Sequence, residues 1–84
     1  MKIRKQEYGT CNIVGRNIEL LRKRRGIKQK DFISRLQTMG VDINPTSYSK
    51  LEGQVRIATD IELYAIAKLL GVSIDSLFEN KTEN

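Results

Sequence analysis

The segment from Asn44 to Ser73, NPTSYSKLEGQVRIATDIELYAIAKLLGVS, constrains the fold more than any other part of the chain. It opens with strong helix-start signals: Asn44 can accept from the free amides of a first turn, and Pro45 lacks the N–H that would be orphaned there. After a basic loop comes a second helical stretch that is apolar nearly all round, which is typical of a central, buried helix. A short polar helix followed by an apolar one indicates a small α-helical domain.

Apolar residues elsewhere recur at the i, i+4, i+7 spacing of helices, and no segment alternates as a strand would. Glycines and capping residues divide these segments, so we expect helices over about 14–25, 29–39, 45–53, 60–70 and 74–78. The residues expected to face the core in the first half are Val14, Ile18, Leu21, Phe32, Ile33, Leu36, Met39, Ile43, Tyr48 and Leu51. The predicted fold class is all-α, a compact bundle of five short helices.

The length of 84 residues allows one domain. Residues 1–13 show no periodicity, so we expect a flexible basic arm there, followed by a domain over 14–79 and a polar tail over 80–84. The single cysteine, Cys11, allows no intrachain disulfide and is typical of a reduced, cytoplasmic protein. Because the chain has neither an 18-residue apolar run nor a leader, we expect cytoplasmic localisation and no membrane contact.

The net charge of +5 is unevenly distributed along the chain. Residues 1–30 have a balance of +8, residues 31–56 a balance of zero, and residues 57–84 a balance of −3. A basic half suits a polyanionic partner, although a solvated basic face would have the same composition. The run from Arg22 to Arg25 lies at a helix C-terminus, where the macrodipole stabilises cations. The same cations could equally attract phosphate. Both roles stay open.

Several short motifs follow one another at a familiar spacing. They are Lys28-Gln29, the run SKLE at 49–52, Arg56, the run DIEL at 60–63, and the stretch 65–73. Over residues 14–78 the chain resembles the lambda-repressor-like helix-turn-helix domain of Cro and phage repressors, also called the xenobiotic-response-element type. The resemblance implies a prokaryotic or phage transcription regulator that represses by occupying its operator, with a recognition helix at about 45–53.

The resemblance also implies partners and site residues. The partner would be double-stranded DNA with a palindromic operator, bound by a homodimer without a cofactor or metal. The positions that match base-contacting residues of the family are Thr46, Ser47 and Lys50. The positions that match phosphate-contacting residues are Lys28, Gln29, Asn44 and Arg56.

Two of the matched positions carry a second interpretation. Arg56 could pair with Asp60 or Glu62 instead of a phosphate, and Glu52 is expected in an intramolecular polar contact rather than on DNA. The chain also departs from the family, since Pro45 stands where a base-reading Gln is frequent. Readout should therefore shift towards the three base-contacting positions.

Other functional classes fit the sequence less well. A protein-interaction module is the alternative, because the acidic last third with Ile74, Leu77 and Phe78 could bind a toxin, a sigma factor or a second copy. Those apolar residues could also simply complete the core. An enzyme is not expected, since the chain has no histidine, no carboxylate pair stands out, and no metal or nucleotide motif is present.

Overall fold

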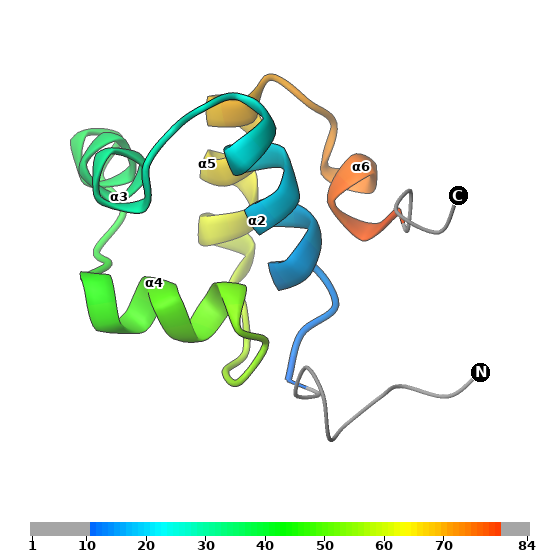
Figure 1. Ribbon diagram of the computed structural model, residues 1–84. Coiled ribbons are helices and arrows are strands. Elements are labelled where there is room, and N and C mark those ends of the chain that lie inside the picture. Colours follow the sequence, from blue (N-terminus) through cyan, green and yellow to red (C-terminus); the bar gives the residue numbers. More distant parts are fainter. Residues whose placement is uncertain (1–10, 80–84) are drawn as a thin grey trace.

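The computed structural model describes residues 11–79 and is all-helical over that range (Figure 1). The helices are α2 (Gly15–Arg24), α3 (Gln29–Thr38), α4 (Pro45–Glu52), α5 (Asp60–Leu70) and α6 (Ile74–Phe78). Helices α2 and α5 pack together in the middle, with α3 on one side and α6 on the other, while α4 lies across the end of α2 (Figure 1). The predicted all-α bundle is confirmed.

Local capping sets the beginning of three helices. The Asn44 Oδ1 accepts from the Ser47 amide at 2.8 Å, with Pro45 at the first position of α4. Thr59 and Glu62 form a reciprocal capping box at the start of α5, and Ser73 caps α6. These starts agree with the sequence prediction because caps depend on neighbouring residues alone.

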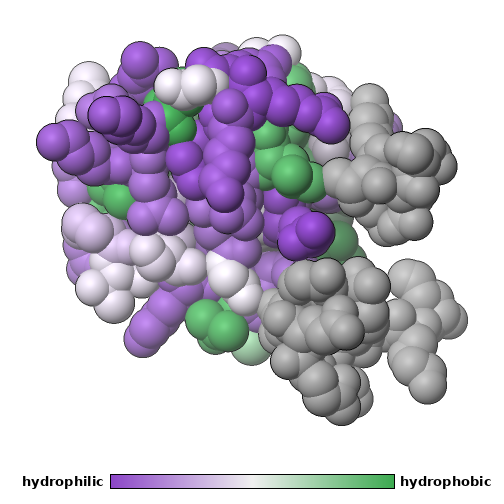
Figure 2. All heavy atoms as spheres, viewed as in Figure 1, coloured by the Kyte–Doolittle hydropathy of each residue, from purple (hydrophilic) through white to green (hydrophobic). Residues whose placement is uncertain are grey.

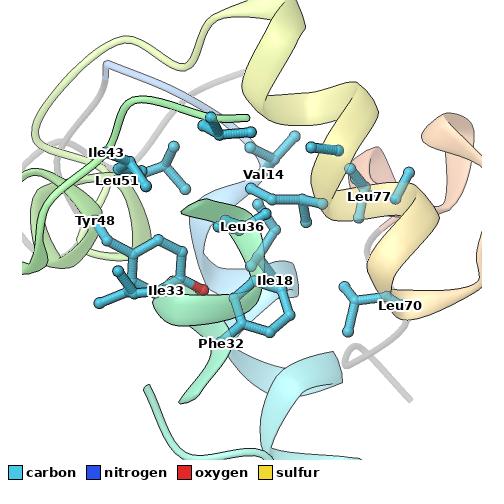
Figure 3. Close-up of a cluster of buried hydrophobic side chains, with 14 residues drawn as sticks. Val14, Ile18, Phe32, Ile33, Leu36, Ile43, Tyr48, Leu51, Leu70 and Leu77 are labelled. Atoms are coloured by element: carbon cyan, nitrogen blue, oxygen red, sulfur yellow. The ribbon is translucent and has the colours of Figure 1, made fainter. Parts of the chain in front are cut away.

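The hydrophobic core draws on every helix and on the α3–α4 connection (Figure 3). Phe32 of α3 and Tyr48 of α4 are fully buried, with ring centroids 5.6 Å apart. Val41 and Ile43, in the connection, close the core between these two helices. The ten labelled side chains of Figure 3 show this convergence: Val14, Ile18, Phe32, Ile33, Leu36, Ile43, Tyr48, Leu51, Leu70 and Leu77.

One prediction about burial is wrong and another holds only in part. Met39 was expected to extend the buried stripe of α3, but that helix ends at Thr38 and Met39, at its C-cap, is 44% exposed. Helix α5 was expected to be the central, buried helix, and one side of it is buried, but Ile61 and Tyr64 on the other side are 68% and 58% exposed. In both cases the apolar residue lies where no other element of the described chain covers it.

Helices α2 and α4 approach each other closely at Gly15. A Cβ on this glycine would lie 2.2 Å from the Leu51 carbonyl oxygen and 2.7 Å from that of Glu52. Asn12, three residues before Gly15, contacts the same region, since its Nδ2 donates to the Leu51 and Arg56 carbonyls at 3.1 and 2.8 Å. The arm predicted over 1–13 therefore contacts the domain at its last residues, while 1–10 lie outside the described residues.

The connection after α4 turns at Gln54 rather than at Gly53. Gly53 keeps a helical conformation with φ of −78°, whereas Gln54 has φ of +64°. The Gln54 side chain donates to the Asn12 carbonyl at 3.2 Å. The positive φ of Gln54 is therefore accompanied by a side-chain contact to the segment before α2.

Candidate nucleic-acid interface

Helix α4 has one open face and one locked face. Thr46 and Lys50 are exposed and Ser47 is half-buried, whereas Tyr48 and Leu51 are fully buried. Hydrophilic residues cover most of the molecular face drawn in Figure 2, and the area over α4 is paler, as expected of a surface rich in Ser and Thr. The three positions that the resemblance matches to base contacts therefore lie together on the solvent side of one short helix.

A buried ion pair holds the locked face. The Arg22 guanidinium of α2 donates to both carboxylate oxygens of Glu52 at 2.7 and 3.2 Å, and the Tyr48 hydroxyl donates to the same carboxylate. Arg22 also donates to the Ile27 carbonyl at 2.8 Å. The hydrogen bond to Glu52 raises the pKa of Arg22, and burial raises the pKa of Tyr48, so the guanidinium stays charged and the phenol neutral.

Sequence reasoning missed this role of Arg22, which it placed in a run of cations at a helix C-terminus. In the structure Arg22 is only 6% exposed, while Arg24 and Arg25 are exposed and Lys23 pairs with Glu19 at 3.0 Å. The signal was the spacing, because Arg22 follows Ile18 by four residues and so lies on the buried stripe of α2. An arginine on an apolar stripe indicates a buried partner, and Glu52 was already expected to have one.

Gln29 extends this cluster to the surface. Its Nε2 donates to Glu52 at 3.2 Å, and its Oε1 accepts from the Ser49 hydroxyl at 3.2 Å. The first residue of α3 is thus attached to α4 at an exposed hydrogen bond. Lys28, immediately before it, is exposed and lies at the N-cap of α3 without a side-chain capping bond. Two residues matched to phosphate contacts therefore lie beside the open face of α4.

Arg56 has the intramolecular role that the sequence left open. Its guanidinium donates to both carboxylate oxygens of Glu62 at 3.0 and 2.9 Å and to the Ile57 carbonyl at 2.7 Å. Its Nε donates to the Ser47 carbonyl at 2.8 Å, so it joins the first turn of α4 to the start of α5. Four of its hydrogen bonds are already made inside the protein. The phosphate role predicted for Arg56 has no comparable observation behind it.

Glu62 is held ionised by these contacts. Burial opposes its charge, but the hydrogen bonds from Arg56 and from the Thr59 amide outweigh burial and lower the pKa of the carboxyl group. The Glu62 carboxylate therefore connects the capping box of α5 with Arg56 in the loop after α4.

Over 11–79 there is no group of three or more His, Cys, Asp or Glu side chains that could hold a metal ion. Within the same range no buried side-chain nitrogen or oxygen lacks a partner. No helix in this part of the chain is long and apolar enough to cross a membrane.

No protein-family model, curated protein or solved structure matches the chain significantly.

Proposed function

We propose that this chain is a sequence-specific double-stranded-DNA-binding regulator of the helix-turn-helix type, with α3 and α4 as the motif and α4 as recognition helix. One observation carries the proposal: α4 offers Thr46, Ser47 and Lys50 to solvent while its other face is fixed by the buried pair of Arg22 and Glu52. A rigid helix with a polar outer face is what direct readout needs, because the bases are read by positioned side chains.

The dimensions of α4 suit the major groove. An α-helix with its side chains is about 10–12 Å across, and the B-DNA major groove is about 12 Å wide. Lys50 would donate to guanine O6 and N7, and the Thr46 methyl group would meet a thymine methyl. Ser47, in the first turn, would donate to a base edge or accept from one.

Phosphate contacts would set the register of α4 in the groove. Lys28, Gln29 and Asn44 flank its open face, and the Gln29 amide is already oriented by Glu52 and Ser49. Contacts of this kind position a protein without reading sequence. Arg56 would act indirectly, since its bond to the Ser47 carbonyl holds the first turn of α4 in place.

Repression by occupancy is the mode of action that fits such a domain. A homodimer would bind a palindromic operator at half-sites about one helical turn apart and exclude other proteins from it. We propose a cytoplasmic location on the same grounds, because the target is the genome.

The test is selection of bound duplexes from a random pool, followed by measurement of affinity for the selected sequence. Lys50→Ala should relax the preference at one base pair per half-site by about 1–3 kcal/mol. Lys23→Ala, which removes the same charge from the far end of α2, should leave the preference unchanged. Negligible affinity for every duplex at low salt would refute the proposal, and an unaltered preference in Lys50→Ala would refute the assignment of that residue.

A protein-interaction module based on α6 is the second candidate. It is favoured by Ile74 and Phe78, which are both exposed and four residues apart on that helix. Phe78→Ser should then abolish capture of a partner protein, such as a toxin or sigma factor, and leave DNA affinity unaffected. A loss of DNA affinity in this variant would count against the second candidate.

A further inference from the structure

A stripe of exposed side chains runs from the loop before α5 along most of that helix. Its apolar members are Ile57, in the loop, and Ile61 and Tyr64, in the helix, which are 72%, 68% and 58% exposed. Asp60 and Lys68 lie on the same side, four residues before and four residues after Tyr64. The Lys68 ammonium lies 5.2 Å from the centre of the Tyr64 ring. We name these five residues the α5 stripe.

The order of charges makes the α5 stripe complementary to itself. Within the helix it runs from Asp60 through Ile61 and Tyr64 to Lys68, with Tyr64 midway between the acid and the base. Two copies packed antiparallel around a two-fold axis at Tyr64 would place Asp60 of each copy against Lys68 of the other. A two-fold interface requires this self-complementarity, because the same patch serves both partners. An unrelated partner would not require it.

We propose that the α5 stripe is the pairing surface for a second copy of this chain. Ile61 and Tyr64 would form the dry centre, the two pairs of opposite charges would form the rim, and Ile57 would lie at the margin. Aromatic residues at the centre and charges at the edge are the usual arrangement of protein interfaces.

The size of the α5 stripe sets how tight this pairing is. Its apolar side chains expose roughly 400 Å² per copy, so that with the charged rim a dimer would bury about 1,000 Å² in total. This total is below the 1,200–2,000 Å² typical of stable complexes and at the boundary for weak ones. The free protein would therefore be a reversible dimer, populated at high concentration.

The position of the α5 stripe also explains how a dimer could bind a palindromic operator, and this part of the inference rests on the proposed function. The stripe begins just after α4, and the intervening loop is fixed to α4 by the Val55 amide, which donates to the Lys50 carbonyl at 3.0 Å, and by Arg56. A two-fold axis at Tyr64 would thus hold two recognition helices at one fixed separation. Half-sites one turn apart require such a fixed separation.

Sedimentation equilibrium of the full chain without DNA tests the pairing. The wild type should form a reversible dimer with a dissociation constant below about 1 mM, and the dimer should be weaker at high salt. Asp60→Lys should raise the dimer dissociation constant at least tenfold, because the new lysine of each copy would then face Lys68 of the other. The double variant Asp60→Lys with Lys68→Asp should restore most of the affinity. Asp75→Lys, which reverses an acid in the first turn of α6, is the matched control and should change nothing.

A second pair of variants keeps the proposal independent of charge. Ile61→Ser should leave the thermal unfolding temperature near that of the wild type and abolish the dimer, since this side chain is mostly exposed. Ile74→Ser, on α6, should leave the dimer intact. A chain that stays monomeric throughout, a charge reversal that is not rescued, or a dimer lost in Ile74→Ser rather than Ile61→Ser would overturn the proposal. Since no DNA is present, failure of the proposed function would leave these results unchanged.

Discussion

Glu52 accepts hydrogen bonds from side chains of three helices: Arg22 of α2, Gln29 of α3 and Tyr48 of its own helix α4. Because the ion pair is buried, the carboxylate and the guanidinium have both lost their hydration, and each depends on the other for compensation. Together with the buried Tyr48 and Leu51, this carboxylate therefore fixes the orientation of α4 and so the direction of Lys50.

Removal of the carboxylate should be far more costly than removal of a surface one. We expect Glu52→Ala to lower the free energy of unfolding by about 3–5 kcal/mol, because Arg22 is left buried without a counter-charge. The double variant Arg22→Met with Glu52→Leu should recover much of this loss, since it replaces two charges with apolar volume. Urea unfolding measures both.

The control for this experiment is Glu19→Ala, which breaks the exposed pair with Lys23. Exposed pairs of this kind contribute less than about 1 kcal/mol, so the control should be close to wild type. Equal effects of Glu19→Ala and Glu52→Ala would show that the pair of Arg22 and Glu52 is not buried in solution.

Glu62 makes the stability of the fold depend on pH in the acid range. Its folded-state pKa lies below the usual value of 4.5, because Arg56 and Thr59 stabilise the ionised form. Its contribution is therefore complete above about pH 4.5 and is lost as the pH falls through the lower folded-state pKa. Urea midpoints should show a gap between wild type and Glu62→Gln that narrows as the pH decreases from 6 to about 3. A gap that is constant over this range would contradict the assignment.

At the scale of elements, the sequence predicted helix boundaries better than helix surroundings. The starts of α4, α5 and α6 follow from Asn44, Thr59 and Ser73, whose caps act within three residues. Burial depends on elements distant in the chain, so periodicity could not reveal that Ile61 is uncovered or which residue pairs with Arg22. Whether a polar helix touches DNA is likewise outside what periodicity can decide.

The candidate site divides in the same way. The open face of α4, with Thr46 and Lys50, follows from the positions of Tyr48 and Leu51 on the opposite side. The hydrogen bond from Arg56 to the Ser47 carbonyl could not be predicted, because it depends on how the loop after α4 folds back.

The close approach of α2 and α4 makes a prediction about Gly15. Alanine favours helices over glycine by about 1 kcal/mol, but a Cβ here would lie 2.2 Å from a backbone oxygen of α4. We expect Gly15→Ala to destabilise the fold by about 1–3 kcal/mol and to weaken specific DNA binding, since α4 must move away. Thermal unfolding and binding titration check the two effects.

Gly53→Ala is the matched control, because Gly53 has a helical conformation and its Cβ would lie 3.2 Å from the nearest atom, the Ser49 carbonyl oxygen. It should change stability by less than about 1 kcal/mol. A Gly15→Ala variant as stable as the wild type would mean that α2 and α4 lie further apart in solution.

At the scale of the whole molecule, charge separates along the chain. Residues 1–30 carry the excess of cations and residues 57–84 the excess of acids, so the molecule has a basic and an acidic part. For a protein that binds phosphates, the logarithm of the binding constant falls linearly with the logarithm of salt concentration. Lys28→Ala should reduce that slope by about one per bound copy and weaken all duplexes alike. A variant that altered the preference between duplexes would contradict a pure phosphate role for Lys28.

The comparison of one selected duplex with its scrambled version tests the central claim most directly. Fluorescence anisotropy at near-physiological salt would give both dissociation constants for the full chain. A helix-turn-helix regulator that reads bases through α4 should bind the selected palindrome about 10³-fold or more tightly than the scrambled duplex. Equal affinity for the two duplexes, or no binding to either at low salt, would contradict the account.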